Sequence, residues 1–294
     1  MSIKDSAAGF DFERFSSTSE LLAAVRSRPC NSVFKSRAAR GDLGSRRPER
    51  GGSFYMSSSF DKGLDLANRG FAEAASKCAV AAERTTAAVN ERVAYSPARP
   101  RPDYVGGSPH VVRAILGLPR DMRRTVRESR QIKGVSLALD IGASGSVSAS
   151  RKIWAGARLV ALLKLFERDG VPVRLLVTRA NLASEDGQRA CCEVVVRDFG
   201  QPLNMSTLCF WAAHPTAHRR VMWAWTETSP IITDDFWACG YGYSVSNPSY
   251  ECETARDALR ADYLMRGVHW FCLADLSCDS AVVDAYEDIK SGRR

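Results

Sequence analysis

Short apolar runs and broad amphipathic segments alternate along residues 135–294, as they do in proteins built from layers of strands and helices. The run Val135–Ile141 is bounded by glycines, so it predicts a buried strand that carries Asp140 near its carboxyl end. A helix over about 150–169 and a second strand over 171–177 follow. Together these elements have the length of a right-handed strand–helix–strand unit.

The polar turn after the second strand is too short to hold another crossover helix. The next apolar run, 191–196, should therefore pair antiparallel with the second strand and lie at an edge of the sheet. The later pattern predicts four helices, over 203–214, 215–226, 254–265 and 280–290. It also predicts one more buried strand, over 268–274. We expect an α/β fold with a mixed, mostly parallel sheet and helices on both faces.

Residues 1–134 have mainly helical patterning. Ser17 and Glu20 have the spacing of a capping box before an apolar stretch, which predicts a helix at about 16–28. The Gly- and Arg-rich segment 26–56 lacks periodicity and is expected to be flexible. We therefore expect a basic, mainly helical N-terminal region over 1–134 and an α/β domain over 135–294.

Helical patterning returns at about 57–95, with a bend expected at Gly70, and the proline-rich residues 96–109 are expected to form a linker. One short helix is expected to begin after Pro109 and another after Pro119. The second would present a strip of positive charge with nearly one arginine per turn, formed by Arg120, Arg123, Arg124, Arg127 and Arg130.

The formal net charge of +8 is carried by the first half of the chain. Residues 1–134 hold 24 Lys and Arg against 14 Asp and Glu, whereas residues 135–294 hold 17 against 19. A basic region attracts phosphate groups and acidic surfaces, so the arginine strip is a candidate nucleic-acid-binding surface. The alternative is an ordinary solvated face.

Nine cysteines occur without a CxxC pair, and no apolar stretch approaches the length of a membrane span. The N-terminus lacks the apolar core of a secretory signal. We therefore expect free thiols, a cytoplasmic location in a host cell and no membrane partner.

Asp140 is followed by a Gly- and Ser-rich loop that contains Ser144 and Ser146. Ligands of open α/β sheets bind outside the carboxyl ends of the strands, and oxygen ligands are those that Mg²⁺ prefers. This corner is a candidate Mg²⁺ site. The alternative is an ordinary strand-to-helix turn in which Asp140 caps the helix.

The order of elements and the Asp140–Ser144 stretch resemble the von Willebrand factor A-type fold, whose members carry Asp-x-Ser-x-Ser at a metal-ion-dependent adhesion site. Asp140, Gly142 and Ser144 occupy the matching positions, so glycine replaces the first serine. The resemblance implies a further acidic ligand from a later loop, for which Asp275 is the best-placed residue. It covers about residues 133–290.

Three stretches also resemble proteins of bacteriophages and plasmids that have no assigned activity. They are residues 106–122, the helix that begins near Ser150, and the segment His214–Arg220. This likeness implies an origin in a mobile genetic element.

Other chemistry has weaker support. His214 and His218 are four residues apart and Cys209 lies nearby, as in some zinc sites, but capping and packing roles are expected instead. No GxSxG elbow or complete phosphate-binding loop is found in the sequence. We therefore expect a non-enzymatic binding or assembly protein with an unknown protein partner. A nucleic-acid-associated protein is the alternative, and a metal-dependent enzyme ranks third.

Overall fold

The computed structural model describes most of the chain. The described ranges are 2–48, 54–72, 101–104, 108–120, 122–124, 134–183, 187–233, 243–246 and 250–292, with Tyr241 and isolated positions between 76 and 87. The chain forms two compact units. Residues 1–88 and 134–294 make up the first unit, and residues 89–133 make up the second.

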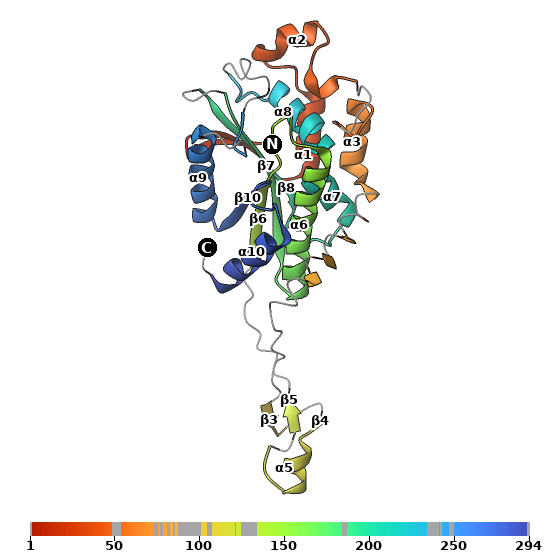
Figure 1. The fold of residues 1–294 in the computed structure, drawn as a ribbon, viewed down its shortest axis with the longest axis vertical. Helices are drawn as coiled ribbons and strands as arrows, with labels where there is room; N and C mark the ends of the chain where they lie inside the picture. The colour runs from red at the N-terminus through yellow and green to blue at the C-terminus, as the bar shows by residue number, and fades with distance from the viewer. Residues whose placement is uncertain are drawn as a thin grey trace. The chain divides into compact units, whose positions relative to one another are not determined.

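A seven-stranded mixed sheet lies at the centre of the first unit (Figure 1). Six strands have the order β1-β2-β8-β7-β6-β10, and β9 pairs with the carboxyl end of β7. The strands are β1 Ile3–Ala7, β2 Phe10–Phe15, β6 Val135–Asp140, β7 Val173–Leu182, β8 Arg189–Arg197, β9 Tyr243–Ser244 and β10 Val268–Cys272. The neighbours β7, β6 and β10 are parallel, whereas β8 is antiparallel to β7.

Helices cover both faces of this sheet, with α9 on the opposite side from α6 and α7 (Figure 1). The longer helices are α1 Thr18–Ser27, α3 Phe60–Arg69, α6 Ala149–Arg168, α7 Met205–Ala213, α8 Trp223–Thr228, α9 Tyr250–Met265 and α10 Asp279–Ser291. A π-helix, η3 Ala217–Met222, leads directly into α8. On the α9 side, Leu259 and Tyr263 join the same buried cluster as Ala138 and Leu176 of the sheet. The expected α/β architecture is confirmed.

The strand–helix–strand unit predicted from the sequence is formed by β6, α6 and β7. The predicted hairpin is formed by β7 and β8. However, β8 is not an edge strand, because β2 pairs in parallel with its other side and β1 pairs with β2. The sequence pattern of 191–196 could not indicate this, since the pairing strand comes from about 180 residues earlier in the chain.

We expected a domain boundary at residue 134, but residues 1–88 belong to the same compact unit as residues 134–294. The N-terminal strands explain this. In β2, Phe10, Phe12 and Phe15 are buried in the first unit. The buried carboxylate of Glu13 accepts hydrogen bonds from Trp225 Nε1 at 2.8 Å and from Ser229 Oγ at 2.6 Å. The N-terminal residues are therefore an integral part of the α/β unit.

The described part of the segment expected to be flexible, residues 26–48 and 54–56, contains short helices. These are η1 Ser32–Phe34, α2 Lys35–Ala39 and η2 Gly44–Arg46. The buried Glu227 carboxylate accepts hydrogen bonds from the backbone N–H and the hydroxyl of Ser45. The segment has no periodic pattern, because polar contacts to Glu227 and single buried residues such as Phe34 hold it in place.

The second unit contains a three-stranded antiparallel sheet and one short helix. Its elements are β3 Arg101–Asp103, β4 Ser108–Pro109, α5 Val111–Ile115 and β5 Met122–Arg124, with the strand order β3-β5-β4. The helix expected after Pro109 is therefore present, whereas the described residues of the stretch after Pro119, residues 120 and 122–124, are not helical. Arg120 has a positive φ of 62°, and Met122–Arg124 pairs with both neighbouring strands.

Helices α6 and α7 approach each other closely at Gly156. A Cβ atom at this position would lie 2.3 Å from the carbonyl oxygen of Ala212 and 2.5 Å from the Cα of Ala213. Because both neighbouring atoms belong to the backbone of a buried helix, they cannot move away without shifting α7. Gly156 therefore sets the distance between the two helices.

We predict that Gly156→Ala lowers the free energy of unfolding by about 1–3 kcal/mol, as overpacking does in other protein cores. Urea denaturation would measure the change. Gly145→Ala is the matched control, because a Cβ atom there would meet nothing within 4 Å. Equal stability of the Gly156→Ala variant and the wild type would contradict the close approach.

Candidate functional site

The carboxyl ends of β6 and β10 form a topological switch point. From β6 the chain crosses through α6 to β7 on one side, whereas β10 lies on the other side of β6. Asp140 of β6 and Cys272 of β10 are aligned at the last paired position. Crevices at such points are where open α/β sheets bind ligands.

Asp140 is fully buried at this point and accepts several hydrogen bonds. Its carboxylate accepts from the Ala180 backbone N–H at 3.0 Å and from Ser246 Oγ at 3.2 Å, and the Gly142 backbone N–H is also a donor. Burial raises the pKa of Asp140 to about 6, although these hydrogen bonds favour the ionised form. The side chain connects the ends of β6 and β7 to the segment that follows β9.

The other residues of the expected Mg²⁺ site have different partners. Ser144 and Ser146 are exposed, and their hydroxyl oxygens lie 3.1 Å from each other. Asp275 accepts from Arg260 at 2.7 Å and from the Cys272 backbone N–H at 2.8 Å. Within the described residues, no group of three or more His, Cys, Asp or Glu side chains is placed to hold a metal ion.

The glycine that replaces a serine in the adhesion-site pattern has a packing explanation. A Cβ atom on Gly142 would lie 2.8 Å from Ser244 Oγ and 3.0 Å from a carboxylate oxygen of Asp140. Strand β9 thus occupies the space that a side chain at position 142 would need. With β9 in this place, position 142 cannot carry a side chain that binds a metal ion.

A buried lysine and histidine lie beside Asp140, and sequence reasoning did not single them out as a pair. Lys152 Nζ is 2.6 Å from His218 Nδ1 and donates to the Ile141 carbonyl at 3.3 Å. Burial, together with the charges of Arg219 and Arg179, holds the pKa of Lys152 well below its usual range. Burial and the Lys152 charge lower the pKa of His218 as well. Both shifts favour the neutral forms of the amine and the imidazole.

Two buried arginines complete this cluster. Arg179 donates to Asn181 Oδ1 and to the Tyr241 carbonyl, and burial lowers its pKa to about 10. Arg219 donates to the carbonyl oxygens of Phe54 at 2.8 Å and Val147 at 2.7 Å. Arg219 therefore holds the loop after Asp140 in one conformation.

The structure gives His214 packing contacts and describes only part of the arginine strip. His214 stacks on Phe210 at 5.5 Å, and its Nδ1 accepts from the Thr216 backbone N–H, so it packs and caps as expected. Of the arginine strip, Arg127 and Arg130 lie outside the described residues. Arg123 and Arg124 lie in β5, and Arg120 is exposed before it, so the helical spacing of one arginine per turn does not apply.

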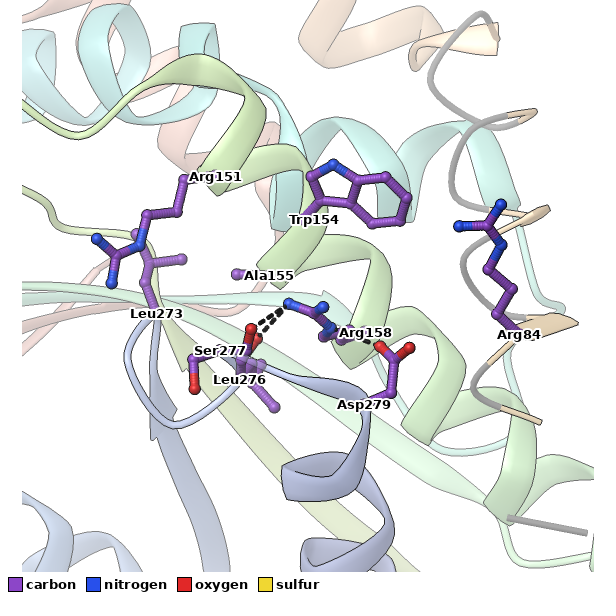
Figure 2. Close-up of a pocket in the computed structure, with 9 residues that line it drawn as sticks. All are labelled: Arg84, Arg151, Trp154, Ala155, Arg158, Leu273, Leu276, Ser277 and Asp279. Atoms are coloured by element: carbon purple, nitrogen blue, oxygen red, sulfur yellow. Dashed lines mark hydrogen bonds and ion pairs between the residues drawn. The ribbon is translucent and has the colours of Figure 1, made fainter. Parts of the chain in front are cut away.

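A pocket of about 420 Å³ opens beside the switch point, between α6 and the loop that joins β10 to α10 (Figure 2). Helix α6 supplies Arg151, Trp154, Ala155 and Arg158, whose spacing of three and four residues places them on one helix face. The β10–α10 loop supplies Leu273 and Leu276, and Arg84 extends from a neighbouring helical segment.

Three arginines line this pocket. The side chain of one is held by bonds to the protein, and the side chains of the other two are exposed. Arg158 is fixed, because it donates to Asp279 at 2.7 Å and to the carbonyl oxygens of Leu276 and Ser277. The side chains of Arg84 and Arg151 are exposed and make no ion pair or hydrogen bond with the described residues. The indole of Trp154 is 43% exposed and lies between them in Figure 2. The pocket therefore combines two free cations with an aromatic surface.

The sequence carries a signal for this pocket. Arg151, Trp154 and Arg158 interrupt the apolar face of the helix at helical spacing, which marks a second, polar-aromatic face. No comparable signal identified Lys152 and His218, because they come from segments 66 residues apart in the chain.

We predict that the stability difference between the wild type and Asp140→Asn depends on pH. The raised pKa means that the folded state binds a proton between pH 3.8 and about 6 that the unfolded state has released. The wild type should therefore lose up to about 3 kcal/mol relative to the variant as the pH rises through this range. Chemical denaturation at a series of pH values measures the difference, and a pH-independent difference would contradict the burial of the ionisable carboxyl.

Among the described residues, no helix is both long and apolar enough to cross a membrane. The seven described cysteines are free thiols, as expected. No curated protein and no solved structure matches the chain. One family model does match, over residues 11–266, and it is described as a domain of unknown function, DUF7192. The match begins in β2 and includes the whole buried cluster around Asp140, so this chain is a member of the DUF7192 family.

Proposed function

We propose that the protein is a non-enzymatic binding or assembly protein of a phage or plasmid, with its contact surface at the carboxyl ends of the strands. In this proposal the α/β unit is a von Willebrand factor A-like domain. The buried Asp140 side chain holds the strand ends in place beneath the proposed contact surface. The exposed loop with Ser144 and Ser146 forms part of the edge of that surface.

The topology supports the von Willebrand A-like part of the proposal. The strand order β8-β7-β6-β10, with β8 antiparallel and α6 joining β6 to β7, follows the order of elements on which the resemblance was based. The proposed surface would also keep its shape, because Arg219 ties the loop at Val147 to Phe54. A preorganised surface loses little conformational entropy when it binds.

The observation that carries the proposal is the pocket at the switch point. Arg84 and Arg151 could form charge-assisted hydrogen bonds with a carboxylate, while Trp154, Leu273 and Leu276 could cover an apolar side chain. A protein segment with acidic and apolar residues next to each other has both features. We therefore propose an acidic segment of a protein partner as the ligand.

The nucleic-acid alternative retains one supporting observation, which is the charge of the second unit. Residues 89–133 hold ten Lys and Arg against four Asp and Glu. A salt-dependent gel shift with DNA and RNA would favour this alternative. A metal-dependent enzyme ranks third. The residues of the expected metal site, Asp140, Ser144, Ser146 and Asp275, form hydrogen bonds with other protein groups.

We predict that the peptide Ac-Glu-Leu-Glu-amide shifts the indole N–H resonance of Trp154 in NMR spectra, whereas Ac-Gln-Leu-Gln-amide does not. Trp154→Phe assigns the resonance. Arg151→Gln should weaken binding of the acidic peptide by about tenfold, as expected for a lost charge-assisted hydrogen bond. Lys164→Gln is the matched control, because it removes a positive charge from α6 outside the pocket. Equal shifts with both peptides, or none with either, would refute the proposed ligand class.

A further inference from the structure

The second unit exposes an unusually apolar surface. Val111, Val112, Ile115, Leu116 and Leu118 are all exposed, and they form what we call the α5 patch. Ile115 and Leu116 are 78% and 64% exposed. Five large aliphatic side chains within eight residues are typical of a contact surface, whereas single exposed aliphatic residues are common on any protein.

The residues around the α5 patch are basic. Arg113 lies within the helix and Arg120 follows it, and the unit as a whole has six more basic than acidic residues. A nucleic acid would neutralise this charge but would leave the aliphatic side chains uncovered. A second copy of the same unit would cover them but would bring two positive surfaces together. The complementary surface should therefore be both acidic and apolar.

The first unit has a surface of this kind at the β10 edge of its sheet. A groove of about 380 Å³ lies between α9 and α10 along β10, and we call it the β10 groove. Its lining includes Leu264, Val268 and Phe271 together with Asp284 and the ion pair of Asp275 with Arg260. Met265, next to the groove, is 82% exposed. Residues 250–291 hold nine Asp and Glu against four Lys and Arg, so the surrounding surface is acidic.

Strand β10 is also an edge strand of the sheet. The strand order places β6 on one side of β10 and no strand of the described residues on the other. Such an edge has backbone groups available for another chain. Apolar side chains, negative charge and an open strand edge thus lie together at the β10 groove.

We propose that the α5 patch of one copy docks in the β10 groove of a second copy. The two surfaces differ, so the contact is heterologous and can repeat from copy to copy in a head-to-tail chain. Opposite charges accelerate and orient the encounter, and the aliphatic side chains supply the buried area. This proposal rests on surfaces other than the pocket at Trp154, so either can fail without the other.

The test uses the full chain and two double variants with substitutions at exposed positions. Ile115→Ser with Leu116→Ser disables the α5 patch, and Leu264→Lys with Met265→Lys disables the β10 groove. Ile3→Ser is the matched control, because Ile3 is also exposed and belongs to neither surface. Circular dichroism melts confirm that each variant is folded.

Sedimentation velocity at increasing protein concentration is expected to show that the wild type and Ile3→Ser associate, more strongly at low than at high salt. Each double variant alone should associate about tenfold more weakly or not at all. A mixture of the two double variants should form a complex of two 32.3 kDa chains, because one intact patch and one intact groove remain between them.

Three results would overturn the proposal. One is a wild type that stays monomeric at every concentration and salt level. Another is a mixture that shows no more association than the separate variants, because the contact would then not join these two surfaces. The last is loss of binding to phosphatidylserine vesicles in the patch variant without any change in self-association, which would assign the α5 patch to a lipid surface.

Discussion

Two adjacent buried arginines on the π-helix η3 hold together segments that are distant in the sequence. Arg219 donates to the carbonyls of Phe54 and Val147, and Arg220 donates to those of Ser45, Arg47 and Ser57. Because a guanidinium offers five N–H donors in a rigid plane, one side chain can satisfy several buried carbonyl groups at once. The N-terminal segment and the loop after Asp140 both depend on these bonds for their shape.

Polar residues near the switch point also form their hydrogen bonds within the protein. Asp140 connects strand ends, and Lys152 and His218 are buried hydrogen-bond partners of each other. Burial of an isolated charge is costly, so the cluster lowers this cost by shifting pKa values and by hydrogen bonding. The pocket around Trp154 differs from the cluster because its arginines are in contact with solvent. The cluster holds the loop after Asp140, and the pocket around Trp154 is where we propose that a ligand binds.

Parts of the candidate site were accessible from sequence and parts were not. Asp140 could be placed at the carboxyl end of a buried strand, because its apolar run and flanking glycines are local features. The assignment of Asp275 to the same metal site depended on resemblance, and the structure places its carboxylate on Arg260. Nothing local indicated that β9 would bring Ser244 against Gly142, since that contact joins segments about 100 residues apart.

Patterns in consecutive residues are enough to predict the strands β6, β7, β8 and β10, the crossover through α6, the β7–β8 hairpin and the later helices. Local periodicity decides these elements, because each buries an apolar face whose spacing is written in consecutive residues. Two features become visible only in the folded protein. Strand β2 extends the sheet beyond β8, and Glu227 and Arg220 hold the Gly- and Arg-rich segment in place. Those outcomes depend on long-range backbone pairing and buried polar contacts, which leave no periodic pattern in the residues that make them.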